Sequence, residues 1–356
     1  MPVTQDFLNQ FSFQHPIIQA PMAGVSTPQL AAAVSNAGGL GSLGIGASTA
    51  AQAREMIEAT RALTARPFNV NVFCHAPAQR DAAREAAWLR YLGPLFAEVG
   101  LDVPEALNEI YRPFPQDRET LDLLLELCPA VVSFHFGLPP KDQLSALRQA
   151  GVLTLATATS PHEARLIERA GIDAVVAQGV EAGGHRGVFD PNAMDEGLST
   201  TVLTRLLVRQ TRLPVIAAGG IMDGPGIRAA LDLGAAAVQL GTAFLLCPES
   251  GAHPAYRANL KSDRGATTRL TSVISGRPAR GLVNRLIAYG EASGSPAPAA
   301  YPVAYDAAKQ LHAAAAKQGS HEFAAQWAGQ GAPLAREMPA ADLLRQLLLE
   351  WQAPEA

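Results

Sequence analysis

The side chain in this sequence best suited to acid–base chemistry is His185, which follows an apolar run and two glycines. Residues 174–187 read Ala-Val-Val-Ala-Gln-Gly-Val-Glu-Ala-Gly-Gly-His-Arg-Gly. The run predicts a buried parallel strand, and in α/β barrels functional residues collect on the loops after such strands. Gly183 and Gly184 lack a Cβ, so the backbone there can approach a flat or anionic ligand. We therefore expect His185 to be catalytic.

A second histidine, His135, closes an apolar segment in Ser133-Phe-His-Phe-Gly137. It is a candidate for the same site, although a single histidine is more often a structural residue with satisfied hydrogen bonds. The remaining histidines have no such context, and the sequence assigns them no functional role: His15, His75, His162, His253, His312 and His321.

Two later segments have the pattern of a phosphate site. Leu213-Pro-Val-Ile-Ala-Ala-Gly-Gly-Ile221 and Gln239-Leu-Gly-Thr-Ala-Phe244 each place glycine directly after an apolar run. Exposed backbone amides beside a short helix N-terminus favour an anion, so we expect phosphate oxygens at Gly219, Gly220, Gly241 and Thr242. The alternative is that these glycines only make tight turns between strands and helices.

Polar residues also interrupt two apolar runs near the N-terminus. In Phe68-Asn-Val-Asn-Val-Phe73 the two asparagines, Asn69 and Asn71, face the same way. Inside a barrel they need hydrogen-bond partners, which a heterocycle or bound water can supply. Pro21 and Met22 end another run, where proline fixes the backbone and the thioether can lie against an aromatic face.

Short apolar runs alternate with amphipathic stretches along the first two thirds of the chain, which predicts repeated βα units. Eight strands with right-handed crossovers close into an α/β (β/α)8 TIM barrel. The expected strands are 16–22, 39–44, 68–73, 130–136, 153–159, 174–178, 215–219 and 237–241, and the expected helices are 27–37, 49–64, 141–150, 161–170, 200–210 and 225–233.

One motif is a decoy. Gly39-Leu-Gly-Ser-Leu-Gly44 satisfies the dinucleotide-binding fingerprint literally. That fingerprint must follow a strand, whereas this stretch follows a helical pattern and is itself an expected strand. We assign its glycines to barrel packing.

Two segments do not fit the barrel pattern. Residues 74–118 are too long for one crossover, and the chain from Pro248 onward is helical and alanine-rich, with a Ser-Pro-Ala-Pro break at 295–298. We expect a barrel over 12–73 and 119–247, and a smaller, mainly helical lobe over 74–118 and 248–356 that covers the barrel mouth. Alanine-rich helices at 307–316 and 340–350 would serve lobe packing or a possible homodimer contact.

Composition excludes several classes of function. A net charge of −4 leaves no basic stripe for nucleic acid. The three cysteines, Cys74, Cys128 and Cys247, lack metal-ligand spacing, so we expect no metal site, no disulfides and a cytoplasmic location. No signal peptide or membrane-spanning run is expected.

Six motifs in order give the chain a family resemblance: Gln19-Ala-Pro-Met22, Phe68-Asn-Val-Asn71, Ser133-Phe-His-Phe-Gly137, Gln178-Gly-Val-Glu-Ala-Gly-Gly-His185, Ala217-Ala-Gly-Gly-Ile221 and Gln239-x-Gly-Thr-Ala-Phe244. Together they resemble the nitronate monooxygenases, formerly called 2-nitropropane dioxygenases, and especially the bacterial class I enzymes. The resemblance implies an FMN-containing (β/α)8 barrel. It also implies oxidation of alkyl nitronates, with propionate 3-nitronate as the usual physiological candidate, by molecular oxygen.

The resemblance also implies roles for individual residues. His185 matches the catalytic histidine of the family. Substrate contacts would come from His135, Tyr111, Tyr256, Tyr301, Tyr305 and Lys309. FMN contacts would come from Ala20, Pro21, Met22, Asn71, Gln178, Gly183, Gly184, Ala218, Gly219, Gly220, Gln239, Gly241 and Thr242.

Two other functions stay open. An FMN-dependent NAD(P)H oxidoreductase, either a quinone reductase or an enoyl reductase, would use the same phosphate loops. A flavin-free barrel that binds a phosphorylated metabolite would also carry them. The combination of Gln19-Ala-Pro-Met22 with the lobe tyrosines favours nitronate oxidation over the reductase, and His185 beside its glycines favours it over the flavin-free barrel.

Overall fold

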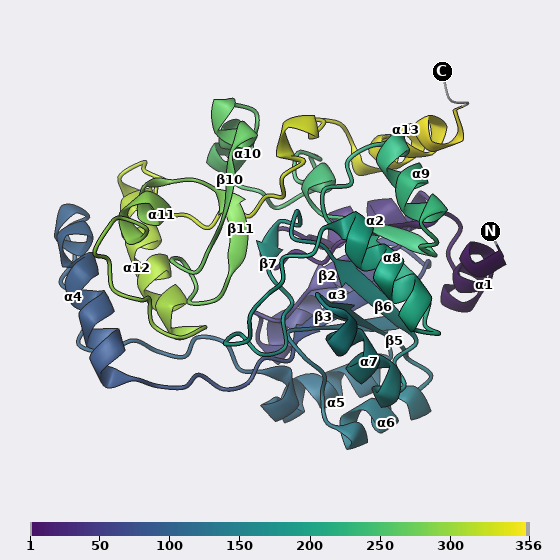
Figure 1. The fold of residues 1–356 in the computed structure, drawn as a ribbon, viewed down its shortest axis with the longest axis horizontal. Coiled ribbons are helices and arrows are strands. Elements are labelled where there is room, and N and C mark those ends of the chain that lie inside the picture. The colour runs from purple at the N-terminus through teal and green to yellow at the C-terminus, as the bar shows by residue number, and fades with distance from the viewer. Residues whose placement is uncertain (1, 354–356) are drawn as a thin grey trace.

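The computed structural model describes residues 2–353, and an eight-stranded parallel barrel lies at its centre (Figure 1). The strands run in the order β1-β9-β8-β6-β5-β4-β3-β2, and a bridge between Ile18 and Leu40 brings the two edges together. Their bounds are β1 (Ile17–Gln19), β2 (Gly41–Gly44), β3 (Phe68–Phe73), β4 (Val131–His135), β5 (Leu153–Ala158), β6 (Ala174–Gln178), β8 (Val215–Ala218) and β9 (Ala237–Leu240). The predicted barrel, with a strand in each expected place, is confirmed.

Helices cover the outside of the barrel. The six expected helices are present as α2 (Pro28–Asn36), α3 (Ala50–Leu63), α6 (Lys141–Gln149), α7 (Pro161–Ala170), α8 (Thr200–Gln210) and α9 (Gly224–Asp232). A further helix, α5 (Arg118–Leu127), was not expected. In β3 the asparagines point inward, while Val70 and Val72 pack outward against helix residues such as Ile57 and Leu124. The period of two in this strand therefore separates a polar interior from an apolar outer layer.

The glycines of β2 serve packing. A Cβ on Gly41 would lie 2.0 Å from the carbonyl oxygen of Ala31 in α2. The helix can approach the strand this closely only because the side chain is absent. The dinucleotide-like fingerprint is thus explained by helix–strand contact.

Two terminal helices complete the barrel. α1 (Pro2–Phe11), which the sequence analysis did not predict, packs Phe7 and Phe11 against the N-terminal end of the strands. α13 (Ala340–Gln352) lies in the range expected for the lobe, yet it packs Leu344 and Leu347 against α2 and α9. After β9 the chain enters a short 3-10 turn, η2 (Thr242–Phe244), instead of a barrel helix. α13 lies beside α9 at this position (Figure 1).

A lobe stands beside the barrel (Figure 1). Its helices are α4 (Ala82–Glu98), α10 (Pro254–Leu260), α11 (Arg285–Gly290) and α12 (Val303–Lys317), with η1 (Phe114–Gln116), η3 (Asp263–Ala266) and η4 (Ala332–Leu334) in its connections. Trp88 and Phe96 of α4 share one core with Ile287 and Leu311, so the insertion and the C-terminal third pack together. The sequence analysis did not foresee its antiparallel sheet, β10 (Thr268–Thr271), β11 (Ala279–Leu282) and β7 (Gly184–His185).

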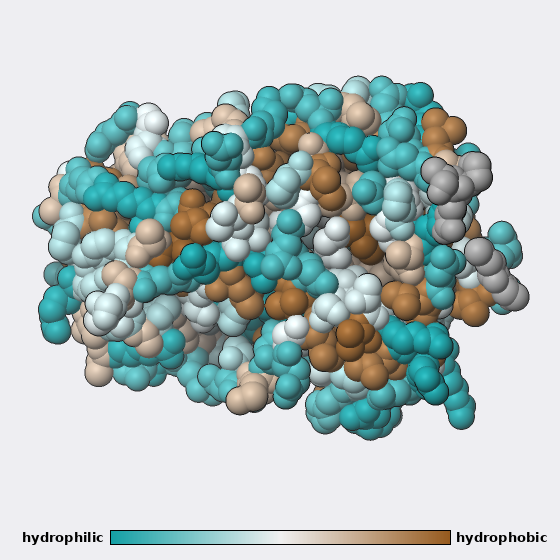
Figure 2. All heavy atoms as spheres, turned by 45° about the horizontal axis from the view of Figure 1, so that its top comes forward, coloured by the Kyte–Doolittle hydropathy of each residue, from teal (hydrophilic) through white to brown (hydrophobic). Residues whose placement is uncertain are grey.

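Within residues 2–353, no helix combines the length and apolar character needed to cross a membrane. On the face shown in Figure 2, apolar residues form separate groups among polar ones.

Candidate active site

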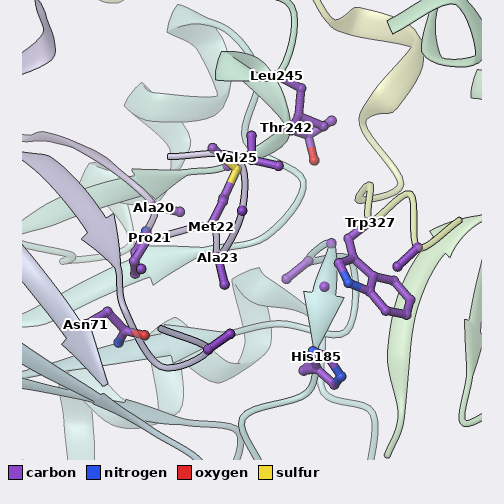
Figure 3. A pocket seen from close by; sticks show the side chains of 18 of the residues that line it. Ala20, Pro21, Met22, Ala23, Val25, Asn71, His185, Thr242, Leu245 and Trp327 are labelled. Carbon is purple, nitrogen blue, oxygen red and sulfur yellow. The ribbon is translucent and has the colours of Figure 1, made fainter. Parts of the chain in front are cut away.

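A cavity of about 840 Å³ opens between the lobe and the C-terminal ends of the barrel strands. It brings together the predicted catalytic, substrate-binding and FMN-binding residues. Figure 3 shows Met22, Asn71, Thr242 and His185 around this space. The lining includes Ala20, Pro21, Met22, Asn71, Tyr111, His135, Gln178, Gly183, Gly184, His185, Ala218, Gly219, Gly220, Gln239, Gly241, Thr242, Tyr256, Tyr301, Tyr305 and Lys309.

His185 is held by contacts from both the barrel and the lobe. It lies in β7, where it pairs with Ala279 of β11, and not in an unpaired glycine turn. Its carbonyl oxygen accepts hydrogen bonds from Gln178 Nε2 at 3.0 Å and from His135 Nε2 at 3.2 Å. Because His135 Nε2 is a donor, its Nδ1 accepts from Thr157 Oγ1 at 3.0 Å. His135 Nε2 and the Gln178 amide group thus hold the backbone carbonyl of His185, and Thr157 orients the His135 ring through Nδ1.

The hydrogen bonds of Ser275 favour one tautomer of His185. His185 Nε2 lies 2.9 Å from Ser275 Oγ, and the carbonyl of Arg277 lies within hydrogen-bond distance of the same hydroxyl, at 3.1 Å. Serine has one hydroxyl hydrogen, so when it donates to Arg277 it acts as acceptor toward His185. This arrangement favours the neutral tautomer with the proton on Nε2. Nδ1 makes no hydrogen bond within the described residues and is left as an acceptor in the cavity lining.

The two glycine loops present free donors to the cavity. Gly219 and Gly220 have φ values of 126° and 71°, which favour glycine. In the part of the chain that the structure describes, the amides of Gly219, Gly220 and Gly241 donate to no other group. Free amides beside the first turn of α9 can bind the oxygens of a phosphate.

On the opposite barrel wall, Asn71 presents a polar group to the cavity. Asn71 donates to Ser133 Oγ at 2.9 Å and keeps its carbonyl oxygen free beside the cavity. Asn69 donates to Ser42 at 3.2 Å and lies below the cavity, in the barrel interior. Of the two asparagines, only Asn71 is therefore placed to contact a ligand. No group of three or more His, Cys, Asp or Glu side chains among residues 2–353 is arranged to hold a metal ion.

The lobe contributes a cation surrounded by tyrosines. The Lys309 ammonium lies 4.8 Å from the ring centre of Tyr111 and 5.5 Å from that of Tyr305. Burial lowers the pKa of Lys309, which means that its charge is only partly solvated. Tyr256 donates its hydroxyl to the carbonyl of Trp327, whereas the buried Tyr301 hydroxyl has no partner among the described residues.

Comparison with known proteins shows the family of the chain. A family model described as nitronate monooxygenase matches residues 5–350. The chain belongs to the nitronate monooxygenase family. It is 60% identical to the nitronate monooxygenase of Pseudomonas aeruginosa PAO1, over 98% of this chain and 99% of that protein. A nitroalkane oxidase structure from Streptomyces ansochromogenes shares 44% identity at a TM-score of 0.87, with 97% of each chain covered. FabK from Thermotoga maritima shares 30% identity at a TM-score of 0.74, over 98% of this chain and 96% of that one.

The sequence analysis did not identify several residues that surround His185. Trp327 lies 5.2 Å from the His185 ring, and Phe136 lies 5.6 Å from it, between ring centres. Ser275 and Arg277 sit in an ordinary turn before β11. Trp327, Ser275 and Arg277 do not follow a barrel strand, so no local sequence pattern identifies them. Phe136 directly follows β4 and precedes Gly137, in the segment that His135 had already marked.

The aromatic surroundings keep His185 neutral. Burial, together with the nearby Arg277 guanidinium and the neighbouring histidines, lowers the pKa of His185 to about 3. The ring is therefore a base and not an imidazolium near pH 7. An anionic ligand would raise this pKa, and the proton gained would lie on Nδ1, facing the ligand.

Ser275→Ala tests the tautomer assignment. The change leaves a buried N–H without its acceptor, which costs about 1–3 kcal/mol. We expect turnover to fall about tenfold with unchanged cofactor content. ¹⁵N spectra of labelled histidine should show the Nε2–H tautomer in the parent and a mixture in the variant. Identical spectra for the two proteins would contradict the assignment.

Because three histidine rings are buried in neutral form, we expect the protein to lose stability in mild acid. Burial lowers the pKa of His75 and His135 to about 4, and that of His185 to about 3. In the unfolded chain these histidines have a pKa near 6.5, so as the pH falls they bind protons before the folded protein does. The stability that these three histidines contribute is thus fully present above pH 6.5 and declines below it. Between pH 7.5 and 5.5 we expect the free energy of unfolding to drop by ~3–4 kcal/mol in urea titrations; an unchanged value would contradict the burial of these rings in neutral form.

Proposed function

We propose that this protein oxidises alkyl nitronates with molecular oxygen by means of bound FMN, releasing nitrite and a carbonyl product. Propionate 3-nitronate is the proposed substrate. The observation that carries the proposal is the shared cavity. It places a phosphate-type pair of glycine loops, a neutral His185 and the Lys309 ammonium around one space.

The residues present fit FMN. The free amides of Gly219, Gly220 and Gly241 suit its phosphate, and a side chain on Gly219 would meet Thr200 Oγ1 at 2.6 Å. The free oxygen of Asn71 can accept from a ring N–H. FMN would supply the redox chemistry, taking electrons from the nitronate and passing them to oxygen. Further proposed contacts are Ala20, Pro21, Met22, Gln178, Gly183, Gly184, Ala218, Gln239 and Thr242.

The charge of the cavity suits a dianionic substrate. Glu55 is the one carboxylate side chain among the described lining residues, whereas Lys309 and five histidines also line it. Lys309 can attract the carboxylate of the substrate, and the tyrosines around it exclude water. His185 Nδ1 can hold a proton at the nitronate end.

Oxygen uptake is the direct test. Purified protein should be yellow, and propionate 3-nitronate should drive oxygen consumption with release of nitrite. A colourless protein that stays colourless after soaking with FMN would contradict the cofactor assignment. It would favour the flavin-free barrel.

The competing NAD(P)H oxidoreductase is tested on the same sample. Under anaerobic conditions, NADH should bleach the flavin slowly or not at all, and propionate 3-nitronate should bleach it rapidly. The reverse order would favour the reductase.

A further inference from the structure

Three histidines that the sequence gave no role come together where the cavity opens. His253 precedes α10, His312 lies on α12, and His321 follows α12. The rings of His253 and His321 are 4.4 Å apart between centres, and those of His312 and His321 are 5.7 Å apart. All three line the cavity, and His253 is also exposed to solvent. The cluster therefore borders both the cavity and the surrounding water.

No carboxylate makes a hydrogen bond or ion pair with this cluster among residues 2–353. The acidic groups on neighbouring segments bind other partners. Two form ion pairs, Glu322 with Arg264 at 2.6 Å and Glu337 with Lys261 at 2.9 Å. Two accept hydrogen bonds from backbone amides, Asp306 from Asn108 at 2.8 Å and Glu249 from Ala340 at 3.1 Å. Arg257 of α10 binds backbone carbonyls of the segment after η2. The imidazoles thus lie beside one another, and Glu55, the carboxylate in the cavity lining, makes no hydrogen bond or ion pair with them.

Two ring nitrogens of the cluster are available to bind a ligand. Nδ1 of His312 is buried and has no hydrogen-bond partner in the described chain. His253 uses its Nδ1 to accept from the amide of Ala255 at 3.2 Å, which leaves its Nε2 free. Burial and repulsion from the other two rings lower the pKa of His312. An anion between the rings would relieve that repulsion and allow more than one of them to carry a proton.

Position on the helix connects this cluster to the deeper site. Lys309 and His312 are three residues apart on α12, so they lie on the same face, one turn from each other. Tyr305 is one turn before Lys309 on that face, and its ring centre lies 6.3 Å from that of His185. A line of groups able to carry positive charge thus leads from the opening toward His185.

We propose that His253, His312 and His321 form an outer anion site that captures the carboxylate of an incoming nitronate and passes it to Lys309. This inference rests on the proposed function, because it assigns the captured group to that substrate. The protein as a whole carries a net charge of −4 and repels a dianion. Local positive charge at the opening offsets that repulsion and raises the rate of productive encounter. Capture is coupled to proton uptake, so it strengthens as the pH falls toward 6.

The test compares two nitronates that differ at one end. Propionate 3-nitronate carries the carboxylate, and propyl 1-nitronate has a methyl group in its place. The ratio of their kcat/KM values cancels effects on His185 and on the flavin. We expect the variant His253→Asn, His312→Gln, His321→Gln to lower this ratio about 5- to 30-fold, because Asn keeps the helix cap of α10 and Gln keeps polarity without charge. The parent ratio should be higher at pH 6 than at pH 8.5 and should fall with added salt, whereas both dependences should be clearly weaker in the variant, where only Lys309 remains to attract the carboxylate.

His162→Gln is the matched control, since His162 is exposed on α7, on the outside of the barrel. It should leave the ratio unchanged. An unchanged ratio in the triple variant, with normal turnover of propyl 1-nitronate, would overturn the outer site while the proposed function stands. Absence of oxygen uptake with both nitronates in the parent would instead overturn the proposed function.

Binding of malonate gives a readout without turnover. Calorimetry at pH 6 in two buffers of different ionisation enthalpy should show proton uptake by the parent. The triple variant should bind malonate at least fivefold more weakly and take up fewer protons. Equal affinity and equal proton uptake in the two proteins would overturn the outer site, whatever the outcome of the kinetic test.

Discussion

Replacement of His185 by asparagine is expected to lower turnover of propionate 3-nitronate by about 10²–10⁴-fold, the range typical of a lost acid–base group. Asparagine can still approach Ser275 and occupies less volume, but its amide cannot take up a proton as Nδ1 does. The backbone contacts of residue 185 with Gln178 and His135 do not depend on the side chain, so the glycine loops and FMN content should be preserved.

Oxygen uptake measures the turnover, and the visible spectrum measures FMN content. His162→Asn, on the outside of the barrel, is the control for a histidine change without access to the cavity. Unchanged turnover in His185→Asn would refute the assigned role.

Gly219→Ala is expected to produce a folded protein that loses FMN on purification. A side chain at φ 126° is strained, and the new Cβ would lie 2.6 Å from Thr200 Oγ1 and 3.1 Å from the amide of Ala182. Relief of this strain must move the loop whose amides face the phosphate. A strain of ~1–3 kcal/mol corresponds to FMN binding weaker by about 5- to 150-fold.

Fluorescence titration of the apoprotein with FMN measures this change. Gly151→Ala is the matched control, because Gly151 also has a positive φ of 77° but has open space around it and lies outside the cavity lining. It should lose stability without losing FMN affinity. Equal FMN affinity in Gly219→Ala and the parent would show that this loop does not hold the phosphate.

The barrel and one wall of the site could be predicted because their signals are local. Runs such as 68–73 and 174–178 alternate or stay apolar over a few residues, and glycines at 171 and 234 end the preceding helices with φ values of 74° and 99°. Parallel strands that share one sheet also share one carboxyl edge. Residues that follow separate strands, such as Met22, Asn71 and Gly219, must therefore converge once the barrel is recognised.

The sequence by itself thus determined the barrel, its glycine loops and the position of His185 at the open end. The tertiary structure decided what surrounds that histidine. Ser275, 90 residues later in the chain, selects its tautomer, and Trp327 covers its ring. The outer histidines and the docking of α13 on the barrel likewise depend on how distant segments meet. The physical reason is that strand and turn preferences act within a few residues, whereas burial, pKa and hydrogen-bond partnership depend on neighbours in space.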